Sequence, residues 1–314
     1  MTGIGLSRLA ISVPDTVDSV EEVLRASGSS ASEIKVFTRM FKLRDSPSWP
    51  LDQQMDDLLV EAGRRALADG GGADLVLYGH SLMTQEVSLR PGFAQRVLKQ
   101  LDLEATPFFG ISGVACTAPL RAVDLARDYV RKFPERKVLV LAGDLGATTS
   151  VARVIPRLTV LGDALGAFTV AREGVRYRHV ASASRTDPRF RRGMRMDADD
   201  LRLFGRACAE LVLDVLAEAA NTAGIAIKDV DWVMPHLVNA LAWKVFSEQV
   251  GIPHERFLLD LLPSQGHVYG LDALTSLEYA DRLGKLRPGD LCALLSVGQG
   301  AYFHALIVEV VEEE

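Results

Sequence analysis

Short runs of apolar residues, each bounded by Gly, Pro or Asp, recur along the chain and predict β-strands. They occupy residues 73–79, 137–144, 230–236 and 290–298. Between them, apolar residues recur at intervals of three and four positions, which is typical of amphipathic helices. The helices predicted in this way occupy residues 55–69, 118–132, 201–224 and 271–286. Strands that alternate with helices of this length predict parallel βαβ units and therefore an α/β layered fold.

The order of these elements occurs twice, which indicates a weak internal duplication. "FFGISGVACTAPL" and "KVLVLAGDLGA" in the first half correspond to "FLLDLLPSQGHVYGLDAL" and "DLCALLSVGQGA" in the second. The correspondence puts Cys116 and His267 at equivalent strand-to-helix turns and His236 at the end of a strand. Two halves related by a pseudo-twofold axis would bring these side chains together at the carboxyl ends of strands, where ligands bind in α/β sheets.

Cys116 is the best candidate for a nucleophile. Its neighbours Gly113, Ala115, Thr117 and Ala118 are small and leave room for a substrate carbonyl. Pro119 suits the first turn of a helix, so the thiol would lie at a helix N-terminus, where the dipole favours a thiolate. An arbitrary cysteine is more often a buried core residue, but this setting favours reactivity.

His236 and His267 are candidate acid–base groups. A neutral imidazole can accept a thiol proton and later donate a hydrogen bond to a thioester oxygen. Each ring taken alone is compatible with a plain structural role at the end of an element. The duplication favours the catalytic interpretation, because it directs both rings towards Cys116.

Gly298 and Gly300 lie at a predicted turn between two strands, "SVGQGAYFHALIVEV". Their backbone amides can approach a substrate closely, so we expect them to form an oxyanion hole together with the N–H of Cys116. The remaining histidines have no metal-ligand spacing, and we predict no metal site. The remaining cysteines, Cys208 and Cys292, lie among apolar neighbours and are interpreted as core residues.

Composition narrows the function classes. The formal net charge of −6 provides no general attraction to nucleic acid or anionic membrane. The chain has neither a leader-like start nor a run of about 18 apolar residues, and its three scattered cysteines form no disulfide framework. We therefore expect a cytoplasmic protein.

Several ordered motifs make the chain resemble the thiolase superfamily, most closely its β-ketoacyl-acyl carrier protein synthase III-like branch. They include "VFTRMFKLR", which is similar to an arginine-rich turn, and "GVACTAPLRAVDLA", which is similar to the nucleophile segment. "VLGDALGAFTV", "VMPHLVN", "GHVYG" and "LRPGDLCALLSVGQG" follow in the family's order.

The resemblance implies a thiolase-like fold of two duplicated βαβαβαββ halves in a five-layered αβαβα architecture. Residues 1–170 would carry the nucleophile and residues 171–314 both histidines. It also implies that Cys116 is acylated and that His236 is the catalytic histidine. A homodimer is implied as well. No cofactor would be bound permanently, and acyl-phosphopantetheine would be a substrate.

Two departures from the family bear on the reaction. His267 replaces the asparagine that, with the histidine, stabilises the enolate of a malonyl unit, and "VYGLDAL" after it is bulkier than usual. We therefore expect the protein to take an acyl group from a carrier or coenzyme A thioester onto Cys116 and to pass it to a second acceptor. The expected setting is specialised metabolism of a polyketide- or fatty-acid-like kind rather than primary lipid synthesis. Decarboxylative Claisen condensation is the alternative. A non-catalytic partner of a ketosynthase is a second alternative.

An acidic acyl carrier protein is the expected partner, since "SRTDPRFRRGMR" is rich in arginine on an otherwise acidic chain. The family's coenzyme A-stacking tryptophan is not found in "SEIKVFTRMFK". The expected contacts to the carrier or its phosphopantetheine arm are Arg39, Arg185, Arg189, Arg191, Arg192, Asn239 and Lys244.

Overall fold

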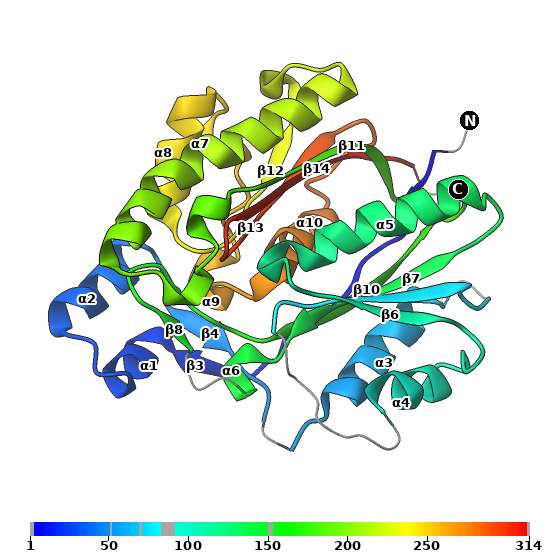
Figure 1. Cartoon of the computed structure of the whole chain (residues 1–314), viewed down its shortest axis with the longest axis horizontal. Helices are drawn as coiled ribbons and strands as arrows, with labels where there is room; N and C mark the ends of the chain where they lie inside the picture. The colour runs from blue at the N-terminus through cyan, green and yellow to red at the C-terminus, as the bar shows by residue number, and fades with distance from the viewer. Residues whose placement is uncertain (1–2, 51, 69–70, 83–91, 150–152, 313–314) are drawn as a thin grey trace.

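The computed structural model describes residues 3–50, 52–68, 71–82, 92–149 and 153–312 (Figure 1). Within these residues, ten strands join into one mixed sheet in the order β12-β13-β14-β11-β1-β10-β7-β5-β6, with β2 paired to β10. These strands are β1 (Gly5–Leu6), β2 (Ala10–Ser12), β5 (Leu75–Gly79), β6 (Phe108–Ile111), β7 (Val138–Asp144), β10 (Ala164–Ala171), β11 (Tyr177–Thr186), β12 (Trp232–Met234), β13 (Leu291–Gly298) and β14 (Tyr302–Val310).

In the described part of the chain, six long helices pack on the sheet, and shorter elements lie at one end of it. The long helices are α3 (Met55–Ala66), α4 (Phe93–Gln100), α5 (Ala118–Lys132), α7 (Ala198–Ala223), α8 (Ala240–Val250) and α10 (Asp272–Arg282). The shorter elements are α1 (Val20–Ala26), α2 (Ala31–Lys35), α6 (Gly146–Thr149), α9 (Leu262–Gln265), β3 (Val17–Ser19), β4 (Asp45–Pro47), β8 (Val154–Ile155) and β9 (Thr159–Val160).

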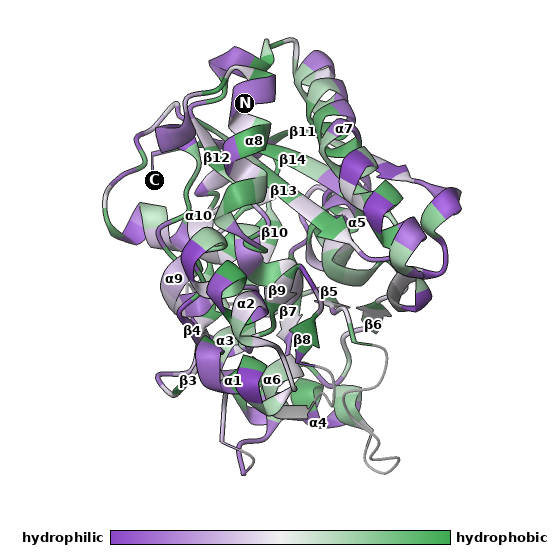
Figure 2. Cartoon of the chain, turned by 90° about the vertical axis from the view of Figure 1, so that its left-hand side faces the viewer, coloured by the Kyte–Doolittle hydropathy of each residue, from purple (hydrophilic) through white to green (hydrophobic). Residues whose placement is uncertain are grey.

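The elements form five layers. α5 and α10 lie between two groups of strands of this sheet, one with β5, β7 and β10 and the other with β13 and β14 (Figure 1). Both helices pack in one core cluster with both groups. α3 and α4 cover the outer face of β5, β7 and β10, whereas α7 and α8 cover the outer face of β13 and β14. α7 carries hydrophobic and hydrophilic residues along its length, as expected for a helix with one face on the core (Figure 2). This αβαβα arrangement confirms the expected fold class.

The predicted elements are present, but the sheet is less regular than the sequence suggests. β5 pairs in parallel with β6 and β7, and β12 with β13, whereas β10, β11 and β14 run antiparallel to their neighbours. β12 ends before Pro235, which lacks the N–H that a longer ladder needs. The duplication predicts a strand before the turn that carries His267, next to β12. At that place Phe257 makes only an isolated bridge to Val233. Asp69, the last residue of the predicted helix 55–69, lies outside the described residues.

The short strand β1 joins the two halves, because Gly5 and Leu6 pair with β10 on one side and with β11 on the other. The expected boundary between residues 1–170 and 171–314 falls at the end of β10, and the division into domains stays a prediction. No helix in the described ranges is both long enough and apolar enough to cross a membrane.

Candidate active site

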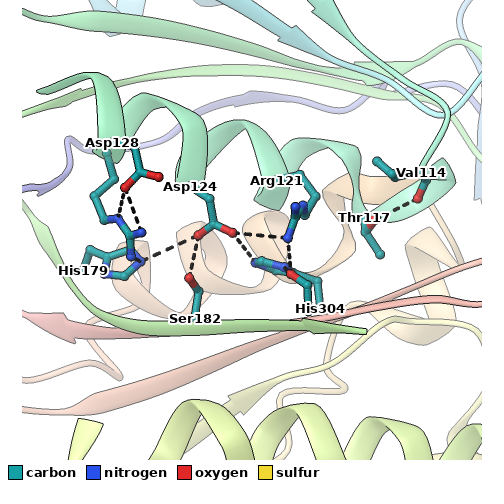
Figure 3. A network of polar contacts seen from close by, with 10 residues as sticks. Val114, Thr117, Arg121, Asp124, Asp128, His179, Ser182 and His304 are labelled. Carbon is teal, nitrogen blue, oxygen red and sulfur yellow. Dashed lines mark hydrogen bonds and ion pairs between the residues drawn. The ribbon is translucent and has the colours of Figure 1, made fainter. Parts of the chain in front are cut away.

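Cys116 lies in a tight 3₁₀ turn, Ala115–Thr117, between β6 and α5. The preceding Ala115 has φ +48°, a left-handed conformation that a residue with a side chain adopts only when its surroundings impose it. Thr117 Oγ1 donates a 2.7 Å hydrogen bond to the carbonyl of Val114 and closes the turn (Figure 3). Pro119 follows in the first turn of α5, as predicted. The turn therefore presents the thiol at the N-terminal end of a fifteen-residue helix.

The backbone of this turn packs tightly against the second half of the chain. Ser296 Oγ donates a 2.7 Å hydrogen bond to the carbonyl oxygen of Cys116. A Cβ atom added to Gly270 would lie 2.6 Å from the same oxygen and 2.5 Å from Cδ of Pro119. Only glycine at position 270 allows this approach, so the turn before α5 and the turn before α10 support each other.

His267 is oriented towards the thiol by a carboxylate. Its Nε2 lies 3.9 Å from Cys116 Sγ, and its Nδ1 donates a 2.7 Å hydrogen bond to Asp272 Oδ2. Asp272 is the first residue of α10, and its Oδ1 accepts a 2.7 Å hydrogen bond from the N–H of Val268. Cys116, His267 and Asp272 thus stand in the relative order of a catalytic triad.

His236 lies beside this triad, just after β12. Its ring is centred 4.4 Å from that of His267, and its Nδ1 is 3.2 Å from Asp272 Oδ2. The N–H of Leu237 donates to the same carboxylate oxygen, and Trp243 Nε1 donates to the carbonyl of His236. The ligating atoms of Cys116, His236 and His267 all lie within 4.8 Å of one another. The structure therefore brings together the three side chains that the sequence analysis selected.

The environment separates the charge states of the two histidines. Burial by itself lowers the pKa of His267, but the charge and the hydrogen bond of Asp272, together with Cys116, reverse this effect and raise it to about 10. Burial and the neighbouring His267 lower the pKa of His236 to about 3, against the influence of Asp272. Near neutral pH, His267 therefore holds a proton and His236 is neutral.

Cys116, His236 and His267 are the one group of side chains within the described ranges that is close enough to hold a metal ion. The prediction that no metal is bound stays a prediction.

A cavity of about 710 Å³ opens onto these groups. Apolar side chains from α7, α8 and residues 155–161 make up most of its wall. The polar residues on the wall outside the catalytic group include Ser81, Arg191, Asn239 and Gln299. A cavity of this size, with a few polar residues on a mostly apolar wall, suits a small-molecule ligand or the arm of a larger one.

The glycines expected at an oxyanion hole occupy the β13–β14 hairpin, but they differ in position. Gly300 has φ +110° and lines the cavity. Gly298 instead faces the nucleophile turn, since an added Cβ would lie 2.6 Å from the carbonyl oxygen of Val114. Gln299, which the sequence analysis did not select, lines the cavity beside Gly300. The role of these amides in catalysis stays a prediction.

The arginines of the segment 184–195 are exposed, and three of them have carboxylate partners. Arg185 pairs with Asp214 and Glu218, Arg189 with Asp187, and Arg192 with Asp197 and Asp200. The segment therefore carries less free positive charge than its sequence suggests. Exposed pairs are weak, however, so a phosphate or carboxylate can compete for these arginines. Arg191 differs because it lines the cavity.

The other expected carrier contacts lie in different settings. Arg39 is exposed in the π-helical turn Val36–Met40, and Lys244 is exposed on α8, as predicted. Asn239 is buried, and its side-chain oxygen accepts a hydrogen bond from the N–H of Ala242 as the N-cap of α8. It reaches the cavity wall but not the outer surface.

The two remaining cysteines differ from each other. Cys292 is fully buried on β13, as predicted. Cys208 packs against the core cluster on the inner side of α7, as the core interpretation requires, but it is only partly buried and also lines the cavity. Burial raises the pKa of its thiol to about 12, so it is a neutral wall residue rather than a second nucleophile.

A buried polar network fixes α5 behind the nucleophile (Figure 3). Asp124 on α5 accepts a 2.6 Å hydrogen bond from Ser182 on β11. His179 and His304, to which the sequence analysis gave no role, each lie 3.8 Å from the same carboxylate. The network links α5 to β11 and β14 and thereby holds the helix that begins at the active site.

Sequence reasoning missed Asp272 and Ser296. The available signal for Asp272 was an acidic residue five positions after His267, at the start of a predicted helix. Ser296 gave no signal, because a serine within a predicted strand has no distinguishing pattern.

Comparisons with known proteins show what the chain is similar to in sequence. Residues 220–310 match the family described as 3-oxoacyl-[acyl-carrier-protein (ACP)] synthase III C terminal. A β-ketoacyl-[acyl-carrier-protein] synthase III of Coxiella burnetii (strain Dugway 5J108-111) is 25% identical over 278 residues, covering 81% of this chain and 83% of the relative.

Solved structures show the same fold. A protein named ChlB3 [Aceyltransferase] superposes with a TM-score of 0.85 at 20% identity, covering 99% of this chain and 98% of its own. The 3-oxoacyl-[acyl-carrier-protein] synthase III of Aquifex aeolicus VF5 superposes with a TM-score of 0.81 at 19% identity, covering 98% of this chain and 100% of its own. The chain is therefore similar in sequence to β-ketoacyl-[acyl-carrier-protein] synthase III proteins and shares the fold of their solved structures.

Proposed function

We propose that this protein is an acyltransferase that forms an acyl thioester on Cys116 and passes the acyl group to a second acceptor. The observation that carries the proposal is the arrangement of Cys116, His267 and Asp272. His267 lies 3.9 Å from the thiol and is held by a 2.7 Å hydrogen bond to a buried carboxylate. A protonated imidazole in this position is a suitable charge partner for a thiolate nucleophile.

In the first half-reaction, Cys116 Sγ attacks the carbonyl carbon of a donor thioester and forms a new C–S bond. The C–S bond to the donor then breaks, and His267 Nε2 gives its proton to the departing thiolate. The N–H of Cys116 and the amides of the β13–β14 hairpin would stabilise the oxyanion. Ser296 supports this step by holding the carbonyl of Cys116.

In the second half-reaction, the acceptor's hydroxyl or thiol attacks the acyl-Cys116 carbonyl. His267, now neutral, takes the acceptor's proton, and the bond between the acyl carbon and Sγ breaks. Asp272 favours this step because its charge raises the proton affinity of His267. The enzyme returns to its starting state with His267 protonated.

Decarboxylative condensation is the second candidate, since the curated relative carries the name of a condensing enzyme. Condensation needs two hydrogen-bond donors for the malonyl carbonyl, whose oxygen becomes negative. Here His267 stands where the resemblance implies an asparagine, and the following Val268 and Tyr269 are bulkier than the small residues expected there, with Tyr269 on the cavity wall. This replacement supports transfer over condensation.

We propose an acyl carrier protein as the donor, because the related synthases are named for that carrier. Arg39, Arg185, Arg189, Arg191, Arg192 and Lys244 are its proposed contacts, with Asn239 reached only by the phosphopantetheine arm inside the cavity. The acyl-phosphopantetheine would be a substrate rather than a resident cofactor. Specialised metabolism is the proposed setting.

The test is intact-mass analysis after the protein is incubated with acyl thioesters. We expect a mass increase of one acyl group in the native protein and none in Cys116→Ala. Added malonyl carrier should produce neither carbon dioxide nor a β-ketoacyl product, whereas an alcohol or thiol acceptor should release the acyl group. Abundant β-ketoacyl product would establish condensation. Failure of every thioester to label Cys116 would favour the non-catalytic partner.

A further inference from the structure

The three reactive side chains also form a set of metal-ligating atoms. Sγ of Cys116 and one ring nitrogen each of His236 and His267 lie within 4.8 Å of one another. Thiolate sulfur and imidazole nitrogen are ligands that zinc prefers, whereas magnesium and calcium take oxygen. The prediction of no metal site rested on spacing along the sequence, which does not show proximity between separate segments.

The distances in this set need little adjustment to hold zinc. In a tetrahedral site with a Zn–S bond of about 2.3 Å and Zn–N bonds of about 2.0 Å, sulfur and nitrogen stand about 3.5 Å apart. Cys116 Sγ and His267 Nε2 are 3.9 Å apart. A small rotation of the cysteine side chain can close this difference.

Asp272 provides the outer contact that metal-binding histidines have in proteins. A ligating histidine almost always donates its other N–H to a carboxylate, a carbonyl or water. His267 Nδ1 donates to Asp272 Oδ2 over 2.7 Å, which leaves Nε2 for a metal. Nδ1 of His236 lies 3.2 Å from the same oxygen and, within the described ranges, is buried without a hydrogen-bond partner. A metal on Nε2 of His236 would hold its Nδ1–H towards this carboxylate.

The cavity gives an ion access to these atoms and room for a further ligand. Cys116, His236 and His267 all line it, so an ion can enter from the cavity and a water molecule can complete a tetrahedral site. His267 holds a proton near neutral pH. Zinc would replace this proton: bonds form from the ion to Nε2 and Sγ, and the displaced proton passes to water.

We propose that Cys116, His236 and His267 bind Zn²⁺ reversibly and that the bound ion blocks the thiol. Zinc is an exchangeable inhibitor here rather than a resident cofactor, because Sγ cannot react while it ligates the metal. The inference goes beyond the proposed function and does not depend on it, since a bound metal blocks every reaction at Sγ, including simple alkylation. Cd²⁺, which also favours thiolate, should bind in the same way.

The first experiment is a titration of the metal-free protein with Cd²⁺, followed by the ultraviolet charge-transfer absorption of the cadmium–thiolate bond. The absorption should saturate at one ion per chain in the native protein and be absent in Cys116→Ala. His236→Gln should weaken cadmium binding by at least about tenfold. Cys208→Ala is the matched control, because it removes the other thiol of the cavity wall and should keep the native titration. Equal titrations for the native protein and Cys116→Ala would overturn the inference.

The second experiment uses the native protein alone and measures alkylation of Cys116 by iodoacetamide, with mass as the readout. Zinc at about ten times its dissociation constant should slow alkylation about tenfold, since only the metal-free fraction reacts. A chelator should restore the rate, and magnesium at the same concentration should not change it. An alkylation rate that excess zinc leaves unchanged would refute the site.

These outcomes are separate from those of the proposed function. Zinc protection of a thiol that no acyl thioester labels would support the metal site while the proposed function fails. Acylation of Cys116 that excess zinc does not slow would support the proposed function and overturn the metal site.

Discussion

Asp272 is the residue on which the proposed chemistry depends most. Its carboxylate raises the pKa of His267 to about 10 against the effect of burial. Asp272→Asn keeps the shape but removes the charge, so His267 should lose its proton at lower pH. We expect acylation of Cys116 to slow by about 10²-fold or more at pH 7, and the alkaline fall in rate to move to lower pH.

The control for this variant is Glu278→Gln, which removes a carboxylate from the same helix α10 far from the cavity wall. Its pH profile should match that of the native protein. Equal profiles for Asp272→Asn and the native protein would show that the carboxylate does not act through His267.

Gly270 lies where the turn before α10 contacts the turn before α5, so a substitution at Gly270 tests this contact. In Gly270→Ala, the new methyl group would lie 2.6 Å from the Cys116 carbonyl oxygen and 2.5 Å from Pro119. Because both neighbours are held in place, we expect a loss of about 1–3 kcal/mol in the free energy of unfolding. Denaturant titration measures it. Gly205→Ala is the matched control, since its methyl group enters open space and should stabilise α7 by up to about 1 kcal/mol.

The helix α5 owes its position to the buried network around Asp124, and this network predicts acid sensitivity. Burial lowers the pKa of His304 to about 4, although Asp124 nearby favours the protonated ring. Arg121 on α5 and His179 on β11 also oppose protonation. A histidine in the unfolded chain takes up its proton near pH 6.5, whereas His304 in the folded chain resists until about pH 4. Stability should therefore fall between these two values.

We expect His304 to account for up to about 3 kcal/mol of this loss. Melting temperatures measured from pH 7 to pH 4 for the native protein and for His304→Gln should converge as the pH falls. His254→Gln, which replaces an exposed histidine, should follow the native curve. A native-like slope in His304→Gln would contradict the assignment.

The large sheet ends in β6, and this edge predicts how copies of the chain associate. Among the residues that the structure describes, β6 pairs with β5 alone, and Phe109 on it is 59% exposed. An unprotected edge strand with an apolar side chain is a template for pairing with another strand. We expect a second copy of the chain to occupy it and form the predicted homodimer.

Phe109→Lys should weaken this association by at least about tenfold, because the charge would be buried between strands. Analytical ultracentrifugation across a concentration series measures the effect. Leu283→Lys places the same charge at another exposed apolar residue, just after the end of α10, and should leave the association unchanged. A native protein that stays monomeric at all concentrations would refute the homodimer.

The element order, the layered fold and the three reactive side chains could be predicted from the sequence, because each depends on neighbouring residues. Apolar periodicity identifies a strand or helix locally, and the duplicated order places Cys116 and His267 at matching turns. The small residues around Cys116 likewise indicate an open site within a single stretch of sequence.

Other features depend on how distant segments pack, and no local pattern reveals them. Asp272 orients His267 because α10 begins where the two turns meet, and Cys208 faces the cavity because α7 and α8 stand apart there. The partners of Arg185 lie 29 and 33 positions away along the chain. Local sequence encodes conformation and reactivity, whereas proximity between separate segments arises only when the hydrophobic layers assemble.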